Sequence, residues 1–292
     1  MEQVPVRLPE QVDGRNVLVL PRGADPIALA TAWFQEASWA RTPVARTRRQ
    51  TGARFRGMVA EAPTVPGLIA LAPGLALEGP TEIDSDHARE AGLGARDVDL
   101  YALDVAEGVD VTLVYGWMSA AARRVGGAIV PADRSRLVSP DPGAAVDLTL
   151  WSPLALTGRD ARLLVRPAMS GARVGPPVEP GAGAMSVTAT FEYDGAVTVR
   201  LARSREIPVA LSALDVGEYG PWAYQVTWEP LEPDELLTES PSPLHVIARS
   251  RVQQSVARIA AALWRGAGGT VVDSGGFVVP PGELLDLATA AR

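Results

Sequence analysis

The sequence predicts an α+β fold made of two similar split β-α-β modules of ferredoxin-like type, with helices on one face of each mixed or antiparallel sheet. Short β-branched runs alternate with amphipathic stretches, a strong hairpin signal lies in the second half, and two segments carry the same order of elements. A chain of 292 residues suits about two domains. We expect modules at 1–160 and 161–292, with a Gly/Pro-rich loop at about 169–184.

The first half alternates strands and helices. The run Asn16–Pro21 is short, apolar and ends at proline, which is typical of a buried strand. Asp25 as N-cap and Pro26 at the first helical position predict a helix through about Ser38. We further expect strands at 55–60, 67–71, 97–105, 128–130 and 136–138, and helices at 109–125 and 142–150.

The second half contains the clearest turn. Alternating residues flank Asp194-Gly195, which predicts a hairpin over 186–203. Beyond it the pattern predicts strands at 244–248, 270–272 and 277–279, and helices at 250–265 and 281–291.

Two segments, one beginning at Gly126 and one at Gly268, share one pattern. They read GGAIVPADRSRLVSPDPGAAVDL and GGTVVDSGGFVVPPGELLDL, each with a double glycine, strand, turn, strand, proline and a helix with Asp-Leu. Duplication explains this similarity, and shared physical demands are the alternative. The pattern resembles the uncharacterised bacterial family DUF4261 over a short part of each half. The matching residues are structural types and the family has no known activity, so the resemblance implies a fold and adds no mechanism. The matching residues include Gly268, Gly269, Val271, Val279, Pro280 and Leu284.

The composition excludes several chemistries. Cysteine is absent, which removes disulfides, thiolate nucleophiles and cysteine-bound metals. All 27 basic residues are arginine, so no lysine can form a Schiff base or serve a phosphate loop. The net charge of −7 argues against nucleic-acid binding. We expect a cytoplasmic protein with no membrane association and no cofactor, monomeric or homodimeric, with an unknown partner that could be a protein.

The densest group of carboxylate and imidazole side chains comprises Glu82, Asp84, Asp86, His87 and Glu90. Such groups bind hard cations or transfer protons, so the candidate catalytic residues are Asp84, Asp86 and His87. The alternative is structural: Asp84 or Ser85 caps a short helix, and Asp86 and Glu90 lie in its first turns near the positive end of its dipole. We predict no metal site.

Arginines in the segment 41–56, which contains no Asp or Glu, are candidate anion ligands, because the guanidinium group donates two parallel hydrogen bonds. The alternative is a solvated loop. The candidate residues are Arg46, Arg48, Arg49 and Arg54.

Tyr219, Trp222, Tyr224 and Trp228 are candidate binding residues, because Tyr and Trp are enriched at recognition hot spots. An aromatic core is the alternative for this set. His245, on the strand expected at 244–248, is interpreted as a partly buried structural residue.

These patterns favour a non-enzymatic binding or interaction protein. The alternative is a small-molecule hydrolase or metal-dependent enzyme that uses the carboxylate–histidine cluster. Convergence of Asp84, Asp86 and His87 in a concave pocket would favour the enzyme, and an exposed helix start would favour the binding protein.

Overall fold

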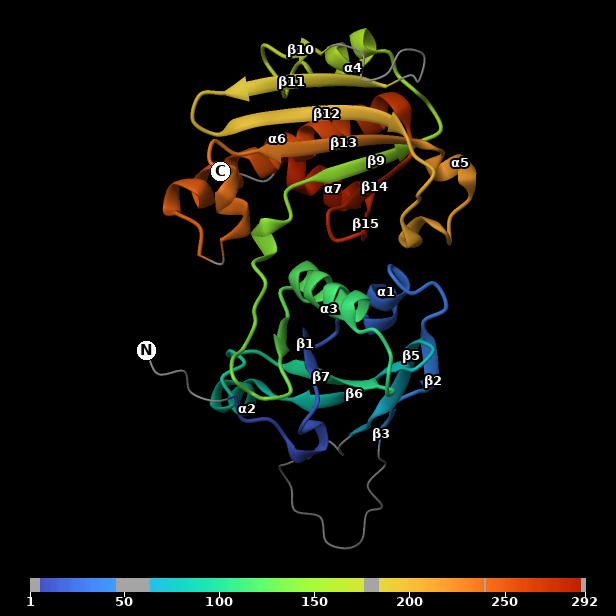
Figure 1. Cartoon of the computed structure of the whole chain (residues 1–292), viewed down its shortest axis with the longest axis vertical. Coiled ribbons are helices and arrows are strands. Elements are labelled where there is room, and N and C mark those ends of the chain that lie inside the picture. Colours follow the sequence, from blue (N-terminus) through green and yellow to red (C-terminus); the bar gives the residue numbers. More distant parts are fainter. Residues whose placement is uncertain (1–5, 46–63, 176–183, 239, 290–292) are drawn as a thin grey trace, which may run out of the picture. The chain divides into compact units, whose positions relative to one another are not determined.

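The computed structural model describes residues 6–45, 64–175, 184–238 and 240–289 (Figure 1). The chain divides into two compact units, Met1–Pro142 and Gly143–Arg292. The class is α+β, as expected, and all described strand pairs are antiparallel.

The first unit is built on a sheet with the order β2-β5-β6-β7-β1-β8, and a separate pair, β3-β4. On one face, Trp117 donates from Nε1 to the Leu29 carbonyl (2.8 Å) and so joins two helices. The strands are β1 (Val17–Pro21), β2 (Ser38–Arg41), β3 (Val44–Ala45), β4 (Thr64–Val65), β5 (Gly67–Ala72), β6 (Leu75–Ile83), β7 (Val98–Val105) and β8 (Ala128–Val130). The helices are η1 (Glu10–Val12), α1 (Pro26–Thr31), α2 (Ser85–Glu90) and α3 (Thr112–Val125).

The second unit is built on a sheet with the order β10-β11-β12-β13-β9-β14-β15. Its core forms where α6 places Val252, Val256, Ile259 and Leu263 on the sheet. The strands are β9 (Leu148–Ser152), β10 (Arg173–Val174), β11 (Met185–Phe191), β12 (Gly195–Arg203), β13 (Trp222–Glu229), β14 (Thr270–Asp273) and β15 (Val278–Val279). The helices are α4 (Gly158–Val165), α5 (Val216–Tyr219), α6 (Pro243–Ala267), α7 (Pro281–Thr289) and the short η2 (Pro142–Ala144), η3 (Val209–Leu211) and η4 (Pro233–Leu237).

Five neighbouring strands follow the same order in both sheets: three consecutive strands, then the first strand of the unit, then the next strand after the long helix. These strands are β5-β6-β7-β1-β8 in the first unit and β11-β12-β13-β9-β14 in the second. Single positions also correspond: Leu18 lies opposite Tyr101 in the first sheet, and Leu150 lies opposite Tyr224 in the second. Both tyrosines are buried, and burial raises the pKa of each phenol.

Local signals predicted several elements correctly. The Asp25 carboxylate accepts from the backbone N–H of Ile27 (2.9 Å) and of Ala28 (3.1 Å), so α1 begins as expected. The hairpin β11-β12 turns before Gly195, and α3 ends at Gly126 in the left-handed region (φ 64°). The strands at 67–71, 97–105, 128–130 and 270–272 and the helices at 109–125, 250–265 and 281–291 are confirmed within a few residues.

Three expected elements are wrong. The helix predicted at 142–150 is only the short η2 followed by strand β9, because residues 147–150 alternate between polar and apolar side chains. The strand predicted at 244–248 is the start of α6, where the Ser242 hydroxyl accepts from the His245 N–H and Pro243 occupies the first turn. The first helix ends at Thr31 and not at Ser38.

Two further expectations have other outcomes. The segment 136–138 makes only an isolated bridge, Ile129 to Val138. The strand expected at 55–60 lies outside the described residues.

We expect Gly127→Ala and Gly269→Ala to lower the free energy of unfolding by about 2 kcal/mol or more. A Cβ at Gly127 would lie 2.4 Å from the Val19 carbonyl oxygen, and one at Gly269 would lie 2.0 Å from that of Trp151. Gly282, in α7, has no atom within 4 Å of such a Cβ, so Gly282→Ala should be neutral or stabilising. Urea denaturation measures all three, and a Gly127→Ala protein as stable as Gly282→Ala would contradict this packing.

Candidate functional site

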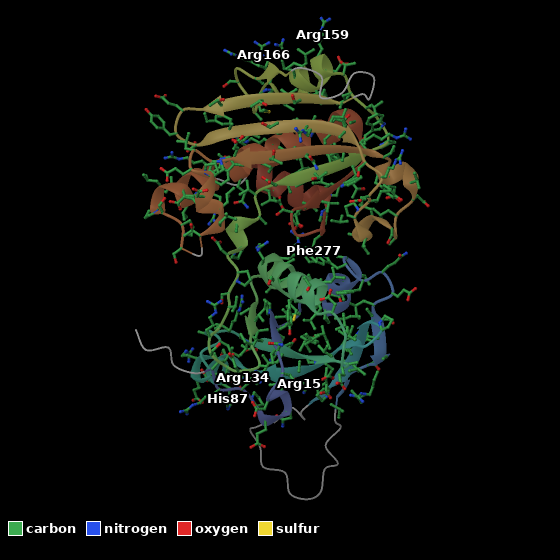
Figure 2. All side chains as sticks on the ribbon, in the orientation of Figure 1. Arg15, His87, Arg134, Arg159, Arg166 and Phe277 are labelled. Carbon is green, nitrogen blue, oxygen red and sulfur yellow. The ribbon has the colours of Figure 1, made fainter. Side chains whose placement is uncertain are left out.

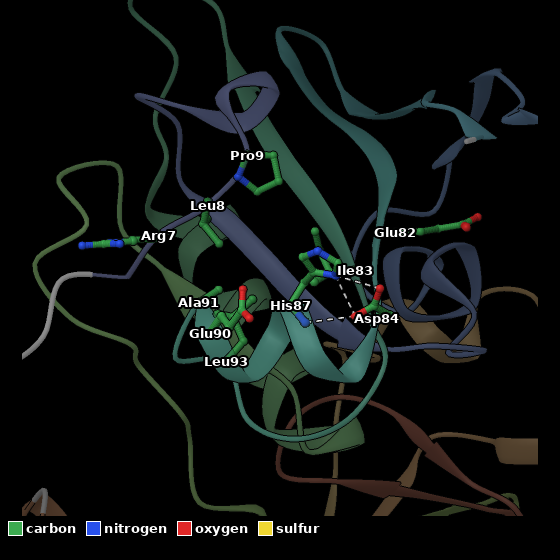
Figure 3. A pocket seen from close by; sticks show the side chains of 10 residues that line it. All are labelled: Arg7, Leu8, Pro9, Glu82, Ile83, Asp84, His87, Glu90, Ala91 and Leu93. Carbon is green, nitrogen blue, oxygen red and sulfur yellow. Dashed lines mark hydrogen bonds and ion pairs between the residues drawn. The ribbon is translucent and has the colours of Figure 1, made fainter. Parts of the chain in front are cut away.

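A pocket of about 480 Å³ lies in the first unit, between the segment 7–9 and helix α2 (Figure 3). One wall is apolar and anchored in the core, because Leu8, Ile83, Ala91 and Leu93 pack with the buried strand residues of this unit. Its polar side chains come from the segment 7–9, from the end of β6, and from α2 with its cap Asp84. The pocket is lined by Arg7, Leu8, Pro9, Glu82, Ile83, Asp84, His87, Glu90, Ala91 and Leu93.

Asp84 and His87 form a bonded pair at the start of α2. The Asp84 carboxylate caps the helix by accepting from the backbone N–H groups of Asp86 (3.1 Å) and His87 (2.9 Å). The Nδ1 atom of His87 lies 2.8 Å from each oxygen of the same carboxylate. Since the cap holds the carboxylate, it also holds the imidazole ring, and Nε2 makes no hydrogen bond within the described part of the chain.

Each member of the pair shifts the pKa of the other, and both are open to solvent. The hydrogen bond from Asp84, and then its charge, raise the pKa of His87, with smaller contributions from Glu90 and Asp86. The backbone N–H of His87, and then its side chain, lower the pKa of Asp84. The side chains of His87 and Asp84 are 72% and 55% exposed, so the site lies at the protein surface and does not form an enclosed cavity.

The predicted cluster is brought together in part. Asp84, His87 and Glu90 face the pocket, whereas Arg7 and Glu82 point away from His87 on opposite sides (Figure 3). The Thr64 hydroxyl donates to Glu82 (2.7 Å).

Asp86 lies apart from this group, because its carboxylate pairs with Arg89 (3.0 Å). Within the described residues no three His, Asp or Glu side chains are grouped so that they could hold a metal ion. Of the three residues whose convergence would favour an enzyme, only Asp84 and His87 line the pocket, and both lie at an exposed helix start.

The aromatic set is packed into the second unit. Tyr224 is fully buried, and its hydroxyl donates to the Leu154 carbonyl and accepts from the Leu156 N–H, both at 2.7 Å. Tyr219 and Trp228 are also buried, and Trp222 is half-buried. Alternate side chains of β13 point into the core, which leaves little aromatic surface for a partner.

His245 is buried on α6 and packs against Trp228, with 5.0 Å between the ring centroids. The arginine candidates Arg46, Arg48, Arg49 and Arg54 lie outside the described residues. Arg41, beside them in sequence, lies 3.6 Å from Glu78.

The sequence does not predict the wall formed by Arg7, Leu8 and Pro9, because only the fold brings this segment close to α2.

No family model matches the chain, and neither a curated protein nor a solved structure shows significant similarity to it. The resemblance to DUF4261 therefore stays a prediction. Among the described helices, none combines the length and hydropathy needed to span a lipid bilayer.

We expect Asp84→Asn to lower the pKa of His87 toward its ordinary value, because the substitution removes the largest cause of the upward shift. Asparagine still caps a helix, so α2 should persist. Asp86→Asn is the matched control and should have a smaller effect, since Asp86 pairs with Arg89. The chain has only two histidines, so an NMR titration resolves each ring. Equal changes in both variants would contradict the assigned pairing.

Proposed function

We propose that this is a non-enzymatic binding protein whose first unit binds a small organic cation, either free or as a basic side chain of a partner. The observation that carries the proposal is the convergence of Asp84, His87 and Glu90 beside an apolar wall in one pocket of about 480 Å³. Pockets of this size accept small molecules.

The charges of the pocket favour a cation. Three carboxylates (Glu82, Asp84 and Glu90) and two basic groups (Arg7 and His87) line it, so the net charge of the lining is negative even when His87 is protonated. An ammonium or guanidinium group forms charge-assisted hydrogen bonds with carboxylates. Its carbon chain would contact Leu8, Ile83 and Leu93, as the stems of Lys and Arg do on apolar surfaces.

We also propose that the two units are copies of one ferredoxin-like module. The central strands run β6-β7-β1-β8 and β12-β13-β9-β14, which in each unit is the order expected of a split β-α-β module. The tyrosine pair Tyr101 and Tyr224 and the glycine pair Gly127 and Gly269 occupy matching places, which supports duplication.

Benzylammonium should bind with a dissociation constant of about 1 mM, measured by chemical shifts on the whole chain. Glu90→Gln should weaken binding about threefold, the scale of one exposed charge pair, while Glu107→Gln, an exposed change outside the pocket, should not. Affinity should rise with pH through the raised pKa of His87, because the imidazolium then loses its positive charge. Equal weakening in both variants, or affinity that falls with rising pH, would reject the proposal.

The second candidate is a small-molecule hydrolase with His87 as general base. The fixed Asp84–His87 pair with a free Nε2 favours it, because a carboxylate that orients an imidazole is the arrangement of general-base catalysis.

Under the binding proposal, 4-nitrophenyl esters of short acids should show no saturable hydrolysis that depends on His87. Saturable hydrolysis that is lost in His87→Gln, kept in Glu107→Gln and increased as pH rises through the His87 pKa would replace the binding protein with the hydrolase.

A further inference from the structure

Exposed arginines gather on one side of the second unit. Arg159 and Arg162 lie on α4, Arg166 is its C-terminal cap, and Arg173 begins β10. Figure 2 shows Arg159 and Arg166 projecting outward from this side of the unit. Helix α4 lies against β10, and a Cβ built at Gly158 would contact the Val174 side chain at 3.0 Å. The four arginines therefore lie around one small region of surface.

A pocket of about 340 Å³ opens beside two of them. Arg162 and Arg166 both line it, and their four-residue separation places them on the same face of the helix. Its inner end is Met169, which is fully buried in the core of this unit. The Ala172 N–H donates to the Met169 carbonyl (3.2 Å), so the chain turns tightly below the pocket.

These arginines have no carboxylate partner among the described residues. The single acid on α4, Asp160, accepts instead from the Thr157 hydroxyl (2.7 Å). The arrangement contrasts with Arg15 in the first unit, which lies 2.8 Å from both Glu78 and Asp104. Like charges four apart on a helix repel, so an unpaired group of this kind is electrostatically unfavourable in the empty protein.

The helix dipole explains only part of this group. Cations in a last turn are favoured, which suits Arg162 and Arg166. Arg159 lies in the first turn, where the dipole disfavours a positive charge. A bound anion would stabilise all of them together.

We infer that this pocket binds a small phosphomonoester through Arg162 and Arg166. A phosphomonoester carries a charge of about −1.5 to −2 near neutral pH and offers three strong acceptor oxygens. Two guanidinium groups can each donate two hydrogen bonds to it. Leu163 and Ala172 supply apolar contact for the organic part of the ligand. This site is independent of the cation pocket of the first unit.

The test is calorimetric titration of the whole chain with phenyl phosphate, at low and at raised NaCl. We expect a dissociation constant below about 1 mM at low salt. Arg162→Gln and Arg166→Gln should each weaken binding about fivefold, and added salt should weaken binding to the unmodified chain. Arg205→Gln removes an equal charge from an exposed position outside the pocket and should change affinity less than about twofold.

Benzoate is the control ligand, because it has the same aromatic ring as phenyl phosphate but carries one negative charge on a carboxylate. It should bind at least about fivefold more weakly than phenyl phosphate, because it offers less charge and fewer acceptors. The arginines are exposed, so the thermal midpoints of the variants should equal that of the parent chain. Absence of phenyl phosphate binding, equal loss in Arg205→Gln, or equal affinity for benzoate would overturn the inference.

Discussion

The first strand of each unit lies between strands that come much later in the chain, and the rest of the unit depends on this pairing. Strand β1 pairs with β7 and β8, and β9 pairs with β13 and β14. Strands β8 and β14 each begin just after a glycine, Gly127 and Gly269 respectively. The backbone of each glycine lies against a carbonyl of the first strand of its unit. The strand pairs within β5-β6-β7 and within β11-β12-β13 join segments that are close in sequence. Pairing of the first strand joins segments that are distant in sequence, and such contacts slow folding.

The candidate pocket is anchored to this central pairing. Helix α2 lies in the connection between β6 and β7, and its Ala88 packs in the same core as Val19 and Leu100. In the second unit the connection between β12 and β13 carries α5, where Tyr219 packs with Trp151 and Ala223. The two units therefore keep similar sheets and differ in the connections that cover them, and differences in the connections are enough to give each unit different surface chemistry.

Signals read within a few residues were the most reliable. The Asp25 cap, the Asp194-Gly195 turn and the left-handed Gly126 each follow from local backbone chemistry. The start of α6 was misread because Leu244 and Val246 flank His245 in an apolar run, yet both are exposed. The Asp84 cap was foreseen, but the wall that faces it requires tertiary structure. The arginines of α4 form no dense run in the sequence, because they are three or four positions apart, and only the helix places them together.

Each described sheet takes all its strands from a single unit, and the border between units falls within the short helix η2. No described strand crosses from one sheet to the other. Each described sheet is thus complete within its own unit, so recombination at this border would exchange one unit without breaking a sheet. Such a boundary also lets the two units change separately, since a mutation that remodels one sheet leaves every described backbone pairing of the other intact.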